Sequence, residues 1–178
     1  MIAITGGPAT GKSVVLRFLN EQGLKTESAD DVVRELWQNP EIVEQVRELL
    51  DLPAAASRED VRTRILNDID ARRSLNALFH APVVRRLFDA KPDAVEIPLL
   101  VETVLHPEFD EVWVLVCGRA IQSQRLMARG LNESAANQLI DAHLPDAVKA
   151  GFATAIVRTD GPLNSVYERV LELLSARS

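Results

Sequence analysis

Two kinds of hydrophobic pattern alternate along the 178-residue chain. Short, nearly continuous apolar runs are typical of strands buried on both faces of a parallel sheet, and apolar residues every three or four positions are typical of amphipathic helices. The candidate strands are residues 1–5, 25–28, 94–97, 112–116 and 153–158. This alternation predicts an α/β fold with a five-stranded parallel sheet sandwiched by helices.

The interval between the second and third candidate strands holds about 65 residues with no strand pattern. Its apolar spacing predicts helices, and Ser57 with Asp60 resembles a capping arrangement. The expected helices are residues 32–37, 41–50, 57–66 and 69–79. Because this interval is too long for a simple crossover, we expect a helical insert over the carboxyl edge of the sheet.

A second insertion, residues 121–145, carries Arg125 and Arg129 and a break at Gly130-Leu131-Asn132 between two expected helices. A final helix is expected to bury one apolar stripe. The stripe is formed by Val166, Val170, Leu171 and Leu174.

We expect residues 1–178 to form a single domain, since length and composition suit one core. Its core would be residues 1–30, 92–120 and 146–178, with a helical insert at about 31–91 and a second insertion at about 121–145.

The composition excludes several classes of protein. Hydrophobic residues make up 47% of the chain, which excludes disorder, while the 4% aromatic content and net charge of −6 argue against a nucleic-acid surface. Cys117 is the single cysteine, so we expect no disulfide and a core position for it, as for Trp37 and Trp113. The apolar run at the start is short and no run reaches 18 residues, so we expect no signal peptide, no membrane contact and a cytoplasmic location.

Residues 6–13, G-G-P-A-T-G-K-S, fit the phosphate-binding pattern G-x-x-x-x-G-K-[ST] between a strand and a helix. Such a loop directs successive backbone N–H groups to one point at the positive end of a helix. Lys12 would contact the β- and γ-phosphates, and the Ser13 hydroxyl would hold Mg²⁺. We therefore expect a nucleoside triphosphate to contact Gly7, Pro8, Ala9, Thr10, Gly11, Lys12, Ser13 and Val14.

With this loop, the two insertions favour a single P-loop kinase domain over a switch GTPase. The helical insert at about 31–91 would bind the acceptor, and the segment at about 121–145 would be the lid. In small-molecule kinases one insert binds the acceptor and another closes over ATP, which excludes water. A switch GTPase needs N-K-x-D and D-x-x-G runs, and the sequence contains neither.

Asp30 follows the second candidate strand and has two interpretations. Ser28 or Asp30 could cap the following helix, with Asp31 interacting with its dipole. Asp30 could instead be a base that takes the proton from an attacking hydroxyl. Arg34, four residues on, could bind an anionic acceptor or pair with Asp30.

Five segments resemble the dephospho-coenzyme A kinase family. The I-T-G-G-P-A-T-G-K-S opening at 4–13 resembles its L-T-G-G-x-x-x-S-G-K-[ST], and Ala29-Asp30 with Arg34 resembles its D-A-D-x-x-x-R. L-N-A-L-F-H at 75–80 is similar to L-N-x-x-x-H-P, and E-I-P-L-L-V-E at 96–102 to D-[IV]-P-L-L-[FI]-E. Q-x-x-R-L-M-x-R at 122–129 is similar to Q-x-x-R-[LA]-x-x-R.

The resemblance implies transfer of the γ-phosphoryl group of ATP to the ribose 3′-hydroxyl of dephospho-coenzyme A, with Mg²⁺ as cofactor. It implies that Asp30 is the base and that Lys12 and Arg129 are catalytic cations. Arg125 would be a second lid cation on the nucleotide. Arg34, His80 and Glu102 would contact the acceptor.

The chain departs from the family pattern at several positions. Ser28 and Glu96 replace aspartates, Ala81 stands where proline is expected, and Gln138-Leu139 provides no second lid cation. The family's following glutamine falls at His143, and Arg158 or Lys149 is a candidate substitute for the missing cation.

Other interpretations stay open. His80 could be a hydrogen-bond partner at a helix end, Arg125 and Arg129 a solvated face, and Glu96 exposed or near Mg²⁺. The chain could be a kinase for another small alcohol or nucleotide, or a nucleotide-binding protein with little turnover. A monomer or small homo-oligomer is expected.

Overall fold

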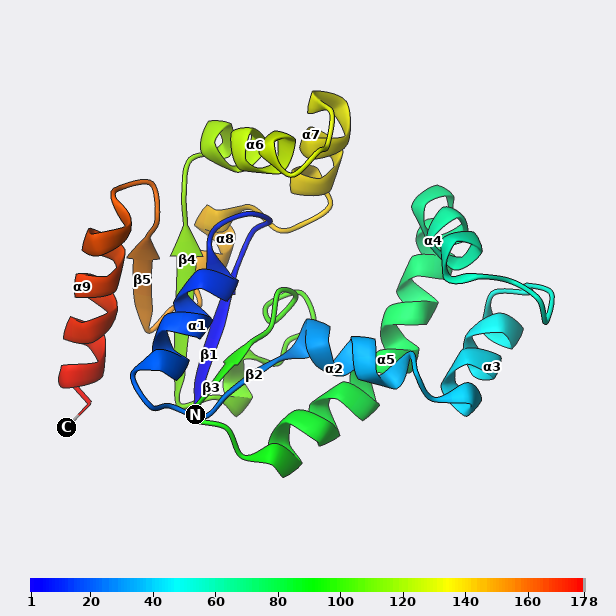
Figure 1. Cartoon of the computed structure of the whole chain (residues 1–178), viewed down its shortest axis with the longest axis horizontal. Helices are drawn as coiled ribbons and strands as arrows, with labels where there is room; N and C mark the ends of the chain where they lie inside the picture. The colour runs from blue at the N-terminus through cyan, green and yellow to red at the C-terminus, as the bar shows by residue number, and fades with distance from the viewer. Residues whose placement is uncertain (178) are drawn as a thin grey trace. The chain divides into compact units, whose positions relative to one another are not determined.

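Five parallel strands lie in the order β2-β3-β1-β4-β5 (Figure 1). A computed structural model describes residues 1–177. The strands are β1 Ile2–Gly6, β2 Thr26–Ser28, β3 Ala94–Glu96, β4 Glu111–Val116 and β5 Ala155–Arg158. The predicted five-stranded α/β fold is confirmed.

Helices precede or follow every strand of this sheet. They are α1 Lys12–Glu21, α2 Ala29–Leu36, α3 Pro40–Leu49, α4 Arg58–Asn67, α5 Ile69–Ala90, α6 Arg119–Ala128, α7 Glu133–Asp141, α8 Asp146–Ala150 and α9 Leu163–Ser175, with a 3₁₀ turn η1 at His106–Glu108. Within residues 1–177, no helix has the length and apolar character that crossing a bilayer requires.

Internal contacts divide the chain into two units. Unit 1 contains residues 1–28 and the chain from 92 onward, and unit 2 contains residues 29–91. Unit 1 therefore holds the whole sheet with α1 and α6 to α9, and unit 2 is entirely helical.

The main core of unit 1 lies between the sheet and two helices. Trp113 on β4 is fully buried in this core, as predicted, and Phe18 of α1 stacks on Tyr167 of α9 with 4.0 Å between ring centroids. The predicted stripe on α9 is partly wrong: Val166 and Val170 are buried, but Leu171 is 42% exposed. The α9 stripe is therefore narrower than its apolar residues alone indicate.

The register of the parallel strands brings several loops to one edge of unit 1. Ile4 of β1 pairs with Glu96 at the end of β3, and Gly6 pairs with Leu115 near the end of β4. The segments that follow β1, β3 and β4 consequently start at the carboxyl edge of the sheet, where open α/β sheets bind ligands.

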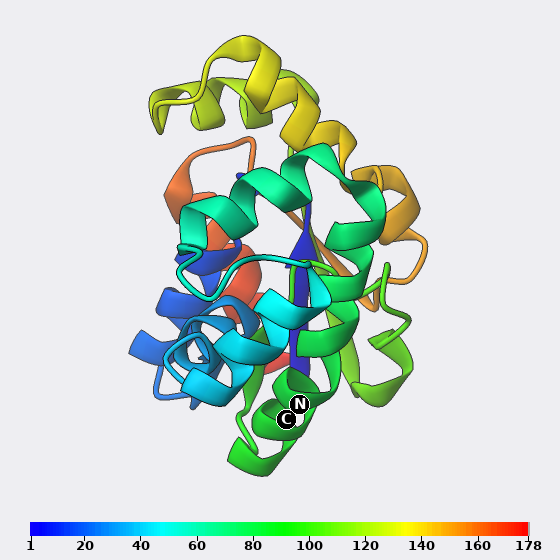
Figure 2. The same ribbon diagram turned by 90° about the vertical axis from the view of Figure 1, so that its right-hand side faces the viewer.

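Unit 2 is made of the helices α2 to α5 (Figure 2). A capping box starts α4, and a continuous apolar stripe follows α5. Ser57 and Asp60 form the predicted capping box at the start of α4. The predicted end of the next helix at residue 79 is wrong, since α5 continues to Ala90 with Pro82 inside it. Apolar residues at four-residue spacing continue through Pro82, which explains the continuation; the buried ones are Leu75, Phe79, Val83 and Leu87.

Candidate functional site

The loop between β1 and α1 has the backbone of an anion-binding turn. Gly6, Ala9 and Gly11 have φ angles of 148°, 56° and 93°. Such left-handed positions next to right-handed ones direct N–H groups inward. Within the described chain, α1 has no side-chain cap and no acidic residue in its first turn. Its first N–H groups are therefore suited to an anionic ligand.

Lys12 and Ser13 start α1 directly after this loop. The Lys12 ammonium donates to the carbonyls of Gly6 and Gly7 at 3.1 and 2.8 Å, so it lies over the loop. The Ser13 hydroxyl donates to a Glu96 carboxylate oxygen at 3.3 Å. Glu96 is 5% exposed, so the interpretation of an exposed Glu96 is wrong. The chain thus places a hydroxyl and a carboxylate together beside the loop.

Asp146 at the start of α8 holds the first part of the phosphate-binding loop, at Gly7. No sequence motif indicated this residue. Its carboxylate accepts from the backbone N–H groups of Gly7 and Cys117 at 3.1 and 3.4 Å and from the Gln122 amide at 3.3 Å. A Cβ on Gly7 would lie 2.8 Å from Asp146 Oδ1 and 2.5 Å from Gln122 Nε2. Alanine at position 7 would therefore force the Asp146 and Gln122 side chains to shift.

Arg125 on α6 contacts the backbone on both sides of the loop. Its guanidinium donates to the Ala9 carbonyl at 3.1 Å and to the Thr159 carbonyl at 2.5 Å. Thr159, after β5, donates from its hydroxyl to the Thr10 carbonyl at 2.7 Å. Arg125 is therefore not part of a merely solvated face, because it joins α6 to the phosphate-binding loop.

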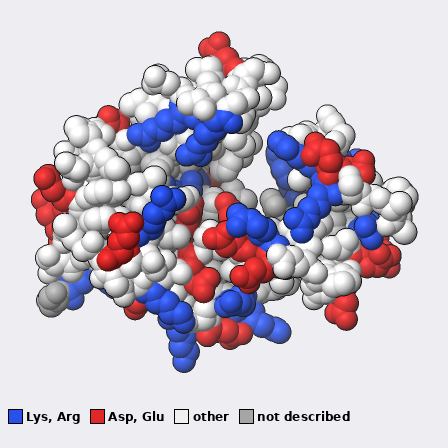
Figure 3. All heavy atoms as spheres, viewed as in Figure 1, with Lys and Arg blue, Asp and Glu red and all other residues white. Residues whose placement is uncertain are grey.

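Arg129 and Arg125 line a pocket of about 240 Å³ in unit 1. Ala9, Gly11 and Val14 form part of the same wall, together with residues of the β5–α9 segment. Figure 3 shows Lys and Arg atoms gathered below α6, on the side of the loop. The structure thus brings together the predicted loop residues and both predicted lid arginines.

Cys117 is buried, as predicted, and its thiol contacts the Arg125 guanidinium. Burial raises the pKa of its thiol, and the Arg125 charge offsets part of this rise. A thiol with a raised pKa is a poor nucleophile, so Cys117 is a packing residue.

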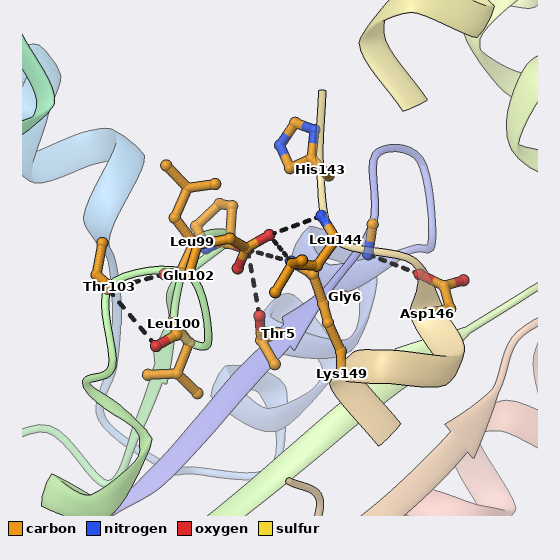
Figure 4. Close-up of polar contacts among 12 residues, drawn as sticks. Thr5, Gly6, Leu99, Leu100, Glu102, Thr103, His143, Leu144, Asp146 and Lys149 are labelled. Carbon is orange, nitrogen blue, oxygen red and sulfur yellow. Dashed lines mark hydrogen bonds and ion pairs between the residues drawn. The ribbon is translucent and has the colours of Figure 1, made fainter. Parts of the chain in front are cut away.

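Glu102 and Lys149 form an ion pair beneath the loop (Figure 4). The Lys149 ammonium is fully buried and donates to Glu102 Oε1 and to the Pro98 carbonyl, both at 2.8 Å. Glu102 Oε1 also accepts from the backbone N–H of Leu144 at 3.1 Å. Lys149 is thus committed to this pair, which leaves it unsuited to replace a lid cation.

Asp30 and Arg34 lie on α2 in unit 2. Arg34 pairs with Asp31 at 2.5 Å, so the predicted alternative pairing with Asp30 is wrong. Asp30 and Arg34 instead share the wall of a pocket of about 390 Å³.

Sequence patterns did not indicate the other polar residues of this second pocket. Arg58 and Arg62 of α4 line it, and the Arg58 guanidinium lies 5.5 Å from the ring centre of Trp37. Trp37 is half-buried and lines the pocket, so its predicted core position is wrong. Apolar side chains complete the lining: Val33, Val61, Ile65 and Leu75. Such a mixture suits a ligand with both anionic and apolar parts.

His80 lies inside α5, ten residues before its end, so its interpretation as a helix-end partner is wrong. Its Nε2 is buried and has no hydrogen-bond partner among the described residues. A buried ring nitrogen without a partner is consistent with a role in binding.

Comparison with known proteins agrees with the sequence resemblance. The family model for dephospho-CoA kinase matches residues 1–165. A dephospho-CoA kinase from Shouchella clausii is 30% identical over 98% of this chain and 96% of its own.

Solved structures share the fold. The Thermus thermophilus protein TT1252 has a TM-score of 0.85 at 25% identity, over 99% of this chain and 96% of its own. A Campylobacter jejuni dephospho-CoA kinase has a TM-score of 0.69 at 20% identity over the same shares. The chain therefore belongs to the dephospho-CoA kinase family of P-loop kinases.

Proposed function

We propose that this protein transfers the γ-phosphoryl group of ATP to the ribose 3′-hydroxyl of dephospho-coenzyme A. The observation that carries the proposal is the phosphate-binding loop of unit 1, in a chain whose family match spans residues 1–165. The hydroxyl oxygen bonds to the γ-phosphorus while the bond to the bridging oxygen breaks, and ADP leaves. The hydroxyl proton passes to a carboxylate of the protein.

On the nucleotide side, the phosphates contact the loop N–H groups, and Lys12 exchanges its two carbonyl partners for the β- and γ-phosphates. Arg129, exposed at the end of α6, contacts the transferring group. Arg125 contacts the nucleotide through the pocket that it shares with Ala9 and Val14.

The residues present fit Mg²⁺. Magnesium prefers hard oxygen ligands, and the Ser13 hydroxyl with the buried Glu96 carboxylate supplies them. When bound, the ion neutralises charge that develops on the β- and γ-phosphate oxygens. Ser13 would be its protein ligand, and Glu96 would orient Ser13 or a water on the ion.

On the acceptor side, Asp30 is the base that takes the hydroxyl proton, and Arg34 contacts the acceptor. The pocket of unit 2 supports this assignment, since Asp30 and Arg34 line it. The arginines of α4 would bind the diphosphate of dephospho-coenzyme A, and the apolar lining would bind its pantetheine arm. Contacts of His80 and Glu102 with the acceptor stay predictions, as do a cytoplasmic location and the oligomeric state.

A second candidate is a kinase for another small alcohol or nucleotide. It is favoured by the lack of a cation at Gln138-Leu139 on α7. Nucleotide binding with little turnover is the third possibility.

ADP release by the purified protein with Mg-ATP, with and without dephospho-coenzyme A, separates these functions. We expect acceptor-dependent release at about 1 s⁻¹ or more, and a product heavier by one phosphoryl group in mass spectrometry. Release at the acceptor-free rate would overturn the proposal, and other nucleotides and alcohols would then be tested as acceptors.

The role of Asp30 is tested with Asp30→Asn. We expect an unchanged affinity for Mg-ATP and a turnover lower by about 10²- to 10⁴-fold, because the hydroxyl loses its base. Glu35→Gln, which also neutralises an exposed carboxylate of α2, is the matched control and should retain turnover. Asp30 lies inside the first turn of α2 and is therefore not its N-cap. If it only interacted with the helix dipole, turnover would be retained and only a stability loss of at most about 1 kcal/mol would appear.

A further inference from the structure

His143 lies in a segment that is fixed beside the phosphate-binding loop. The next residue, Leu144, donates its N–H to Glu102 at 3.1 Å, and Asp146 accepts from the Gly7 N–H at 3.1 Å. Figure 4 shows His143 directly beside Leu144, above the Glu102–Lys149 pair. The backbone that follows His143 is therefore fixed at two points, to Glu102 and to the phosphate-binding loop.

The hydrogen bond of the imidazole defines which ring nitrogen is available. His143 Nδ1 lies 3.0 Å from the Leu139 carbonyl oxygen, one helical turn earlier. Because a carbonyl can only accept, Nδ1 carries the proton in the neutral ring and Nε2 holds a lone pair. This is the one hydrogen bond of the His143 side chain within residues 1–177, while the backbone N–H donates to the Ile140 carbonyl. Nε2 is thus the position at which the ring can gain a proton.

Three charged side chains from separate elements act electrostatically on the ring. Lys149 lies on α8, Lys12 on α1, and Glu102 in the segment after β3. Burial lowers the pKa of His143 below its usual value, and Lys149 and Lys12 lower it further, against the opposing effects of the Leu139 carbonyl and Glu102. These effects together favour the neutral ring when no anion is bound.

Two arginines of α6 already have partners among the described residues. Arg119 is held by both carboxylate oxygens of Asp141, at 2.6 and 3.0 Å, and Arg125 is bonded to backbone carbonyls. Phosphoryl transfer spreads negative charge over oxygens that cations must neutralise. A neutral histidine near the loop can become such a cation by taking up one proton.

We propose that His143 becomes an imidazolium when Mg-ATP binds, and that its Nε2–H then donates to a phosphate oxygen. The proposal rests on the nucleotide half of the proposed function, the binding of ATP at the loop, and not on the identity of the acceptor. The anionic phosphates compensate the charge of Lys12 and add negative charge, which favours the protonated ring against the effect of its burial. His143 is thereby a proton-dependent contact to the nucleotide.

The sign of the pH dependence follows from linkage. Because the complex holds His143 at a higher pKa than the empty protein does, nucleotide binding takes up a proton. The gain in affinity is complete below the pKa of the empty protein and is lost as the pH rises through the higher pKa of the complex. Mg-ATP should therefore bind more tightly at pH 6 than at pH 9.

Calorimetric titration with Mg-ATP in two buffers of different ionisation enthalpy measures the protons taken up. At pH 7 and saturating Mg²⁺ we expect a clear fraction of one proton per nucleotide in the unchanged protein, and about none in His143→Gln. His143→Gln should weaken binding about ten-fold at pH 6 and little at pH 9. His143→Arg, with a permanent charge, should restore tight binding that no longer depends on pH in this range. His106→Gln is the matched control and should keep the proton uptake.

Nitrogen NMR of the unchanged protein gives a second test that needs no variant, since the chain has three histidines. We expect one imidazole to become protonated when Mg-ATP is added at pH 7. Equal proton uptake in His143→Gln, or an imidazole that stays neutral with nucleotide bound, would overturn the proposal. Neither measurement uses dephospho-coenzyme A, so a lack of kinase activity on that acceptor would leave the inference standing.

Discussion

Lys12 shows how one residue serves two states of the loop. Its ammonium donates to the Gly6 and Gly7 carbonyls, which would otherwise lie as uncompensated acceptors beside a phosphate site. A triphosphate offers stronger, charged acceptors at the same end of α1. The side chain therefore has partners both without and with nucleotide, and the loop does not have to unfold to release it.

Replacement of Lys12 separates binding from folding. In Lys12→Ala we expect Mg-ATP to bind at least about 100-fold more weakly, since a charged contact to two phosphates is lost. The increase in Tm that saturating Mg-ATP gives the unchanged protein should disappear. Isothermal titration and thermal unfolding measure both effects.

Arg17→Ala is the matched control, because it removes a positive charge from an exposed position on the same helix. It should keep both the affinity and the Tm increase. Equal losses in the two variants would mean that the general positive charge of α1, and not the Lys12 contact, binds the phosphates.

Residues in a fixed local pattern could be predicted from the sequence, and residues that act across the chain could not. Loop positions 6–13 follow from spacing, because the backbone and one helix terminus create the site. Asp146 meets Gly7 across 139 positions, and Lys149 meets Glu102 through a fold that places α8 beneath the loop. Only the tertiary structure shows that these side chains are already paired.

At the scale of elements, local sequence rules predict where α4 begins but not where α5 ends. The Ser57–Asp60 capping box starts α4 where the sequence indicates, because both partners are three residues apart. The helix was expected to end at residue 79, yet α5 passes through Pro82 and the ribbon changes direction along its course (Figure 1). Proline removes one backbone donor and bends a helix, but burial of the continuing apolar stripe outweighs that loss.

The capping box of α4 should contribute measurably to the free energy of unfolding. Ser57→Ala removes the acceptor for the Asp60 N–H, and Ser57 holds the pKa of Asp60 below its usual value mainly through a side-chain hydrogen bond. We expect the free energy of unfolding to fall by about 1 kcal/mol, measured by urea denaturation. Ser165→Ala on the exposed face of α9 is the control and should change it by less than about 0.5 kcal/mol. A Ser57→Ala protein as stable as the unchanged one would show that the box contributes nothing net.

At the scale of the molecule, the two pockets belong to two separate units. The nucleotide pocket is lined by residues of unit 1 alone, and the arginine-lined pocket by residues of unit 2 alone. Each of the two substrates should therefore restrain a different part of the chain when it binds. This division makes the binding of each substrate observable on its own.

Hydrogen exchange read by mass spectrometry tests this division. Mg-ATP should slow exchange in residues 7–15 and 158–161, and dephospho-coenzyme A should slow it in α4. Since Val61 is the buried residue of α4, this helix has little burial to hold it and should gain protection when a ligand binds. Arg62→Ala should abolish the protection of α4 by the acceptor and keep that of the loop by Mg-ATP, whereas Arg73→Ala, exposed on α5 outside the pocket, should change neither. Protection of unit 1 alone by dephospho-coenzyme A would contradict an acceptor site in unit 2, because a ligand held by Arg58 and Arg62 must restrain the helix that carries them.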